Sequence, residues 1–69
     1  MNREVVDSIK KKYPVGTKVV LDYMDDERPI KEGTKGEVVH VDDMGTIHCK
    51  WENGRMLGLI PFVDGFHKE

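Results

Sequence analysis

The chain has 69 residues, one cysteine and a formal net charge of −2 at neutral pH. This length suits one small domain, and a single cysteine cannot form an internal disulfide. No apolar run approaches the roughly 18 residues of a membrane span, and no apolar segment follows the first residues as in a secretory signal. We therefore expect a single domain over residues 1–69 of a cytoplasmic protein, with no membrane association.

Charge is distributed unevenly along the chain. Residues 1–12 carry four Lys or Arg and two Asp or Glu. Residues 13–69 carry seven Lys or Arg and 11 Asp or Glu. A mildly acidic body is not typical of a general nucleic-acid-binding protein, whose binding face is normally basic. This balance still allows a local basic patch on the first segment.

Residues 1–13 predict an N-terminal helix capped by Asn2. Asn is a favourable N-cap, and the acidic residues of this segment precede its lysines, as the helix dipole favours. Pro14 should end the helix, because proline disfavours the helical conformation in the residue before it. One apolar face at helical spacing should dock on the rest of the domain; it comprises Val5, Val6, Ile9 and Tyr13.

Residues 15–69 change to a period of two, which is typical of half-buried strands. In the first expected strand Val19, Leu21 and Tyr23 share a face, and in the second Val39 and Val41 do. A long charged loop separates these two strands. The expected strands are 17–24, 36–41, 46–51, 55–60 and a short one near 66–67. A helix followed by short strands and Gly-rich turns predicts a mainly β fold, a small barrel of about five antiparallel strands.

The turn over residues 42–45 bears on a candidate metal site. Asp at its first position and Gly at its fourth suit a type I turn with a glycine bulge, which pairs Asp42 with Thr46 and His40 with His48. Two imidazoles about 5 Å apart at Cβ could share a zinc or copper ion, with Asp42 as a third ligand. Structural zinc takes four ligands, and Cys49 points to the opposite face. We therefore predict no metal and no other cofactor.

The register after Asn53-Gly54 has two interpretations. This pair favours positive φ at both positions of a two-residue loop, which would place Met56 opposite Trp51 and turn it inward. The apolar content instead favours burial of Leu57 and Leu59, and a one-residue slip exchanges the two faces. Either a bulge follows Gly54, or both faces of this strand are covered.

No set of residues predicts catalysis. Cys49 alternates with Ile47 and Trp51 on the core face, where a buried thiol is inert. The neighbouring carboxylates of residues 25–27 and 42–43 lie on loops, where water keeps them ionised. The glycines of residues 33–36 precede a strand, whereas a phosphate-binding loop precedes a helix. We therefore expect a protein that is not an enzyme.

Several short motifs carry a resemblance to a known family. They are YPVGT (13–17), MDD (24–26), GTKGEV (33–38), VDDMGTIH (41–48), WENG (51–54) and LGLIP (57–61) with Asp64. Together they resemble an uncharacterised bacterial family, domain of unknown function 4314. The resemblance implies an SH3-like barrel over residues 15–69, in short stand-alone domains of firmicute-type bacteria often associated with phage or mobile elements. Phe62 stands where this family suggests a glycine, and Gly65 where a polar residue is commoner.

By elimination, the sequence predicts a non-catalytic module that binds an unidentified protein or peptide. In small barrels ligands usually meet one groove, flanked by the long first loop and a strand edge. We expect this groove to be lined by Tyr23, Met24, Trp51, Pro61 and Phe62, with Asp25, Asp26 and Glu27 on its rim. An acidic rim attracts basic partners such as Lys- or Arg-rich peptides. The alternative is that Trp51 and Tyr23 are core residues.

Two other functions stay open. A small barrel could bind nucleic acid through cations interleaved with aromatic rings, but the core needs most of the five aromatic residues, so we do not favour it. The cations concerned are Lys10, Lys11, Lys12, Lys31, Lys35, Lys50 and Arg55. An assembly module could pair its fourth strand or its helix with a second copy. We expect a monomer or a weak homodimer.

Overall fold

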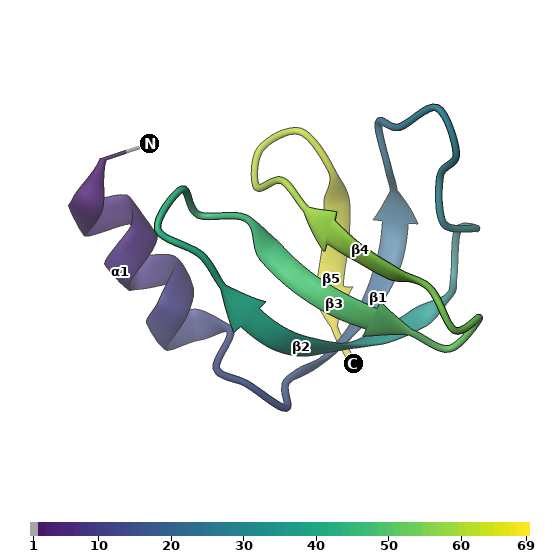
Figure 1. Cartoon of the computed structure of the whole chain (residues 1–69), viewed down its shortest axis with the longest axis horizontal. Coiled ribbons are helices and arrows are strands. Elements are labelled where there is room, and N and C mark those ends of the chain that lie inside the picture. Colours follow the sequence, from purple (N-terminus) through teal and green to yellow (C-terminus); the bar gives the residue numbers. More distant parts are fainter. Residues whose placement is uncertain (1) are drawn as a thin grey trace.

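A computed structural model describes residues 2–69 and shows a mainly β protein (Figure 1). One helix precedes five antiparallel strands, which confirms the predicted fold class. The elements are α1 (Arg3–Lys12), β1 (Lys18–Tyr23), β2 (Lys35–Val41), β3 (Ile47–Trp51), β4 (Met56–Leu59) and β5 (Gly65–Lys68).

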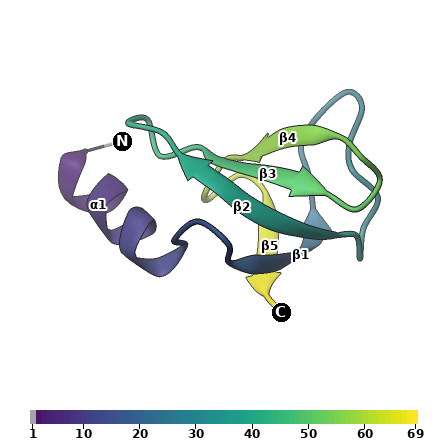
Figure 2. The same ribbon diagram turned by 60° about the horizontal axis from the view of Figure 1, so that its bottom comes forward.

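All five strands belong to one sheet in the order β4-β3-β2-β1-β5. Strands β1 to β4 pair with their neighbours along the chain, and β5 returns to pair with the other side of β1. The sheet is curved, so that β1 and β5 cross behind β3 and β4 in the view of Figure 1, as the turned view of Figure 2 also shows. This order and curvature are compatible with the SH3-like barrel that the resemblance implies.

The core fills the concave side of the sheet. Ile9 joins it from α1, and Trp51 packs so closely on Gly36 that a Cβ there would lie 2.7 Å from the indole Cε3. Removing apolar surface from water contributes about 25 cal/mol per Å² and is the main stabilising effect. The largest fully buried side chains are Trp51, Leu21, Ile47, Leu59, Val19, Val38 and Cys49.

Helix α1 begins and ends where the sequence predicts. The Asn2 side chain accepts a hydrogen bond from the Val5 N–H at 2.9 Å, and three lysines occupy the last turn. Tyr13, which precedes Pro14, leaves the helical region with φ −125° and ψ 66°. The face that packs on the domain buries Val6 and Ile9.

The β2–β3 hairpin has the predicted turn. Asp42 N–H donates to the Thr46 carbonyl at 3.1 Å, Gly45 has φ 85°, and His40 lies opposite His48. The prediction that Val39 and Val41 share a face is wrong, because the register shifts between Val38 and His40. The extra residue of this bulge breaks the period of two, so Val38 and Val41 both point inward.

The β3–β4 hairpin differs from the two-residue loop that Asn53-Gly54 favours. Trp51 N–H donates to the Arg55 carbonyl at 2.9 Å, and only the glycine of the pair has a positive φ, of 87°. The loop therefore has three residues, with the bulge at Gly54, and Met56 does not lie opposite Trp51. The bulge interpretation is confirmed, and Leu59 is fully buried.

Strand β1 also contains a bulge, in its pairing with β5. The register shifts between Leu21 and Tyr23, so the predicted alternation of Tyr23 with Val19 and Leu21 is wrong at its last residue. Tyr23 points outward and is 60% exposed, whereas Met24 turns into the core.

Candidate functional site

A groove lies between α1 and the turn that joins β4 to β5. We call it the helix groove; its volume is about 280 Å³. Its lining residues are Val5, Ser8, Ile9, Lys12, Tyr13, Pro61, Phe62 and Phe66, six of which are apolar or aromatic. Sites for drug-sized ligands usually start at about 300 Å³, so this groove suits one or two side chains of a partner.

Helix α1 supplies one wall of the helix groove through its periodicity. Val5, Ile9 and Tyr13 are four residues apart and lie along one face. Ile9 is buried in the core, while Val5 and Tyr13 are only partly buried against it. The face therefore docks on the domain and still leaves apolar edges accessible to a partner.

The turn after β4 supplies the other wall and is held by Asp64. Its carboxylate accepts hydrogen bonds from the N–H groups of Ile60 and Asp25, each at 2.8 Å, and Asp64 is only 9% exposed. The Asp64 and Val63 N–H groups donate back to the Ile60 carbonyl at 2.9 and 3.1 Å. These bonds fix the backbone of a short apolar loop.

Phe62 occupies the tip of this turn in an unfavourable conformation. Its φ is 70°, in the left-handed region, where the family resemblance led us to expect a glycine. Its side chain is 87% exposed, and the neighbouring Ile60 and Val63 are about half exposed. The turn therefore presents three apolar side chains to solvent.

Two lysines surround the tyrosine at the end of the helix groove. The Nζ atoms of Lys12 and Lys68 lie 5.6 and 5.4 Å from the centroid of the Tyr13 ring, within cation–π range. The Phe66 ring lies 5.4 Å from the same ring, tilted by 59°. This end of the groove thus combines aromatic surface with positive charge.

The structure separates the residues that the sequence assigned to one groove. Pro61 and Phe62 line the helix groove. Met24 and Trp51 are buried in the core, with 7% and 1% exposure, and neither lines the helix groove, which for Trp51 agrees with the alternative that it is a core residue. Their burial follows from the bulge in β1 and from the contact of the indole with Gly36.

The other predicted site residues lie where β1 ends and the long loop begins, near the hydrogen bond from the Asp25 N–H to Asp64. Tyr23 is exposed at the end of β1, and Asp25 and Asp26 are exposed at the start of the following loop. None of the three lines the helix groove. Sequence reasoning missed the contribution of α1 and Phe66 to the groove, although the apolar stripe of the helix had indicated a docking face.

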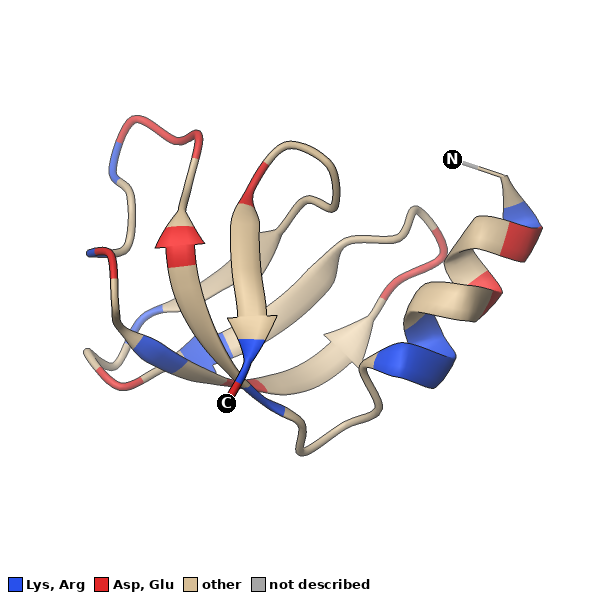
Figure 3. Ribbon diagram, turned by 180° about the vertical axis from the view of Figure 1, so that it is seen from behind, with Lys and Arg blue, Asp and Glu red and all other residues tan. Residues whose placement is uncertain are grey.

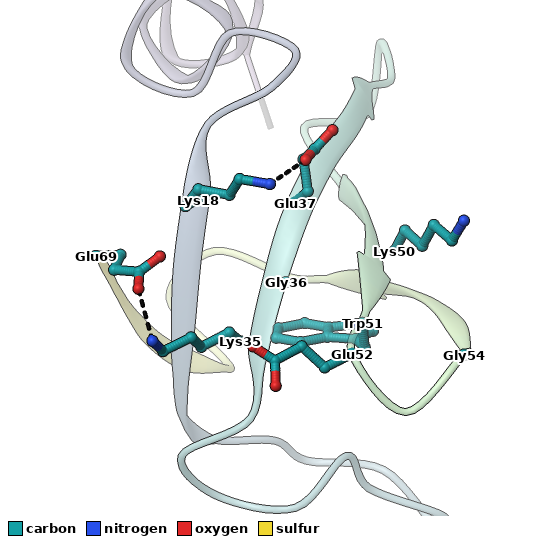
Figure 4. A pocket seen from close by; sticks show the side chains of 9 residues that line it. All are labelled: Lys18, Lys35, Gly36, Glu37, Lys50, Trp51, Glu52, Gly54 and Glu69. Carbon is teal, nitrogen blue, oxygen red and sulfur yellow. Dashed lines mark hydrogen bonds and ion pairs between the residues drawn. The ribbon is translucent and has the colours of Figure 1, made fainter.

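The buried Trp51 lies under a second, charged groove, which Figure 4 shows from close by. This groove has about 610 Å³ and carries three lysines and three glutamates. Lys18 pairs with Glu37, and Lys35 pairs with Glu69 at 2.7 Å. Hydrogen bonds from the two ammonium groups lower the pKa of both carboxyl groups below their usual range. The charges compensate one another, so this groove has no preferred ligand charge.

The two predicted histidines lie side by side on the outer face of the hairpin. The His40 and His48 rings are stacked with centroids 5.9 Å apart, and His48 Nε2 lies 2.8 Å from Asp42 Oδ2. Hydrogen bonds from His48 and from the N–H groups of Thr46 and Met44 lower the pKa of Asp42. Within residues 2–69, no group of three or more His, Cys, Asp or Glu side chains could hold a metal ion.

Cys49 lies in the core, as predicted. It is completely buried, and burial raises the pKa of its thiol to about 11. A thiol with that pKa is protonated at neutral pH and is a poor nucleophile.

Comparison with protein families matches residues 2–69 to the domain of unknown function DUF4314. No curated protein and no solved structure gives a significant match. In the described part of the chain, α1 is too short and too polar to cross a membrane. The family match covers every described residue, and the chain therefore belongs to the DUF4314 family.

Proposed function

We propose that the chain is a non-catalytic module that binds a segment of another protein in the helix groove. The occupant would insert a bulky apolar side chain between α1 and the turn after β4. Six apolar or aromatic lining residues support this choice of occupant. The resemblance supplies the setting, a bacterial cytosolic protein, often one carried by phage or mobile elements.

The observation that carries this proposal is the state of Phe62. A non-glycine residue with positive φ costs on the order of 1–3 kcal/mol, and such strain is characteristic of functional sites. The ring is 87% exposed, so the chain recovers little of that cost by burying it. A partner that covers the ring would recover it, because burying a Phe side chain contributes about 1.5–3 kcal/mol.

Other features support a binding role over catalysis or nucleic-acid binding. The buried Cys49 thiol, with its pKa of about 11, is unsuited to nucleophilic attack. Several cations named for nucleic acid already have other partners. Lys10 pairs with Asp43, Lys35 pairs with Glu69, and Arg55 donates to the Arg28 carbonyl. These contacts engage three of the seven cations, whereas a nucleic-acid-binding face presents its cations together to the phosphates.

A second copy of the chain is a less suitable occupant. A two-fold axis through the helix groove would bring Lys12 and Lys68 of one copy close to the same lysines of the other. Like charges that meet across an interface are unfavourable. We therefore favour a partner with different chemistry.

A displayed library of random nonapeptides, panned against the full chain, tests the proposal. We expect enriched peptides to contain a large apolar residue and to shift the backbone amide signals of Ile9, Tyr13 and Phe62 in ¹⁵N NMR spectra. Ser8→Trp should abolish binding, because Ser8 is an exposed groove residue whose replacement fills the groove without altering the core. Ser8→Ala is the matched control and should bind normally. The proposal fails if no peptide is enriched, or if the shifts map elsewhere.

A further inference from the structure

The two lysines beside Tyr13 differ from the ion-paired lysines of the chain. Lys10, Lys18 and Lys35 each lie within ion-pair distance of a carboxylate. For Lys12 and Lys68, residues 2–69 provide no carboxylate within 4.0 Å of the ammonium group. Both are instead held over the Tyr13 ring. Positive charge at this end of the helix groove is therefore not neutralised by the chain itself.

The lining of the helix groove has the same bias. Among residues 2–69, Lys12 is the one charged residue that lines the groove, and no carboxylate contributes to the lining. The acidic residues of the long loop between β1 and β2 lie at the opposite end of the molecule from the basic last turn of α1, as Figure 3 shows. An acidic partner would thus be repelled by the long loop and attracted by the last turn of α1 and by Lys68. Such charge asymmetry orients an approaching partner.

We propose that the helix groove selects a peptide segment in which a bulky apolar side chain is flanked by Asp or Glu. This inference rests on the proposed function and adds the charge of the partner. The apolar side chain would pack between Ile9 and Phe66, and flanking carboxylates would accept charge-assisted hydrogen bonds from Lys12 and Lys68. An acidic partner reverses the expectation of a basic one, which depended on Asp25 and Asp26 lying on the groove rim.

Nucleic acid shares the negative charge but fits the surface less well. Bases need open aromatic faces for stacking. The Tyr13 ring has Lys12, Lys68 and Phe66 against it, which leaves Phe62 as the one freely accessible ring of the helix groove. The other groove residues are mostly aliphatic and provide no flat platform.

The test uses peptides enriched by panning, with each acidic residue replaced by Gln or by Lys. For the full chain at about 50 mM salt, we expect affinity to fall from the acidic peptide to the Gln form and again to the Lys form. Combining Lys12→Glu with Lys68→Glu should weaken the acidic peptide by about tenfold, since exposed charge pairs each contribute modestly. Combining Arg28→Glu with Lys31→Glu is the matched control, because it makes the same charge change on the distant loop and should alter affinity less than about twofold.

Three outcomes would overturn the inference. If enriched peptides are apolar without an acidic excess, or bind the lysine variants normally, the acidic partner is wrong and the proposed function stands. If no peptide is enriched, both are wrong. If a random-sequence 20-nucleotide single strand binds more tightly than any peptide and loses affinity in the lysine variants, the partner is nucleic acid instead. Thermal unfolding and amide spectra of each variant must show that its fold is retained.

Discussion

The positive φ of Phe62 leads to a quantitative prediction about stability. About 13% of an aromatic surface of roughly 200 Å² is buried here, since the residue is 87% exposed, and this contributes about 0.7 kcal/mol. Phe62→Ala should lose that contribution and keep the strained backbone. Phe62→Gly should also relieve about 1–2 kcal/mol of strain, offset by about 0.5–1 kcal/mol from the more flexible unfolded chain.

Phe62→Gly should therefore be more stable than Phe62→Ala by about 0.5–1 kcal/mol, or a few degrees in the unfolding midpoint of a domain this size. Urea unfolding monitored by the fluorescence of Trp51, the only tryptophan, would measure the difference. Val15 provides the control, because it is 73% exposed and has no positive φ. There the order should reverse, with Ala more stable than Gly. If Phe62→Ala equals or exceeds Phe62→Gly in stability, the argument from strain is refuted.

Three further predictions concern the framework around the site. Gly36→Ala should destabilise the chain by about 1–3 kcal/mol in urea unfolding, because the new methyl group would lie 2.7 Å from the Trp51 ring. Gly65→Ala is the control, because its new methyl group would meet no atom closer than 3.5 Å and should avoid a comparable clash. Asp64→Ala should lower the free energy of unfolding by about 2–3 kcal/mol, because it removes the acceptor of two backbone N–H groups. Asp64→Asn should lower it by about half as much, and equal stability of the two variants in urea unfolding would contradict this. The pKa of about 11 for Cys49, against an ordinary value near 9, should slow its reaction with iodoacetamide at pH 8 by at least about a hundredfold in the folded chain relative to the chain in urea, because the buried thiol is also shielded from the reagent. Stability should decline as the pH rises above about 9, because the unfolded thiol ionises first.

Local residue patterns predict the elements of this fold but not the bulges between them. The two hairpin loops demonstrate the difference, because both end in a glycine with positive φ. Asp42 to Gly45 matches its turn type directly. Asn53-Gly54 matches a shorter loop better, and only the need to bury Leu59 favours the longer one. The bulges in β1 and β2 accompany the curvature of the whole sheet, which no short window of sequence specifies.

The candidate site could be predicted only in part, because short windows of sequence do not specify how distant elements pack together. Pro61 and Phe62, which the sequence analysis places at a groove, line the helix groove. An aromatic residue or a methionine beside a loop suits either a core or a binding site, so the sequence alone does not place Trp51 and Met24. Whether such a side chain is buried depends on the residues that face it. The Trp51 indole is buried because Gly36, which has no Cβ, lets the ring pack directly on the strand. The helix wall of the groove depends on how α1 docks, which is a tertiary property.

The carboxylate of Asp64 has a consequence for the motions of the chain. Its two oxygens accept separately from Asp25 and Ile60, so one side chain joins the start of the long loop to the end of β4. Neither amide can exchange its hydrogen with solvent while Asp64 stays in place, and displacement of this residue exposes both at once. The two amides should therefore exchange as one cooperative unit. Clamping of the turn by a ligand in the helix groove would then slow exchange at Asp25, outside the groove itself.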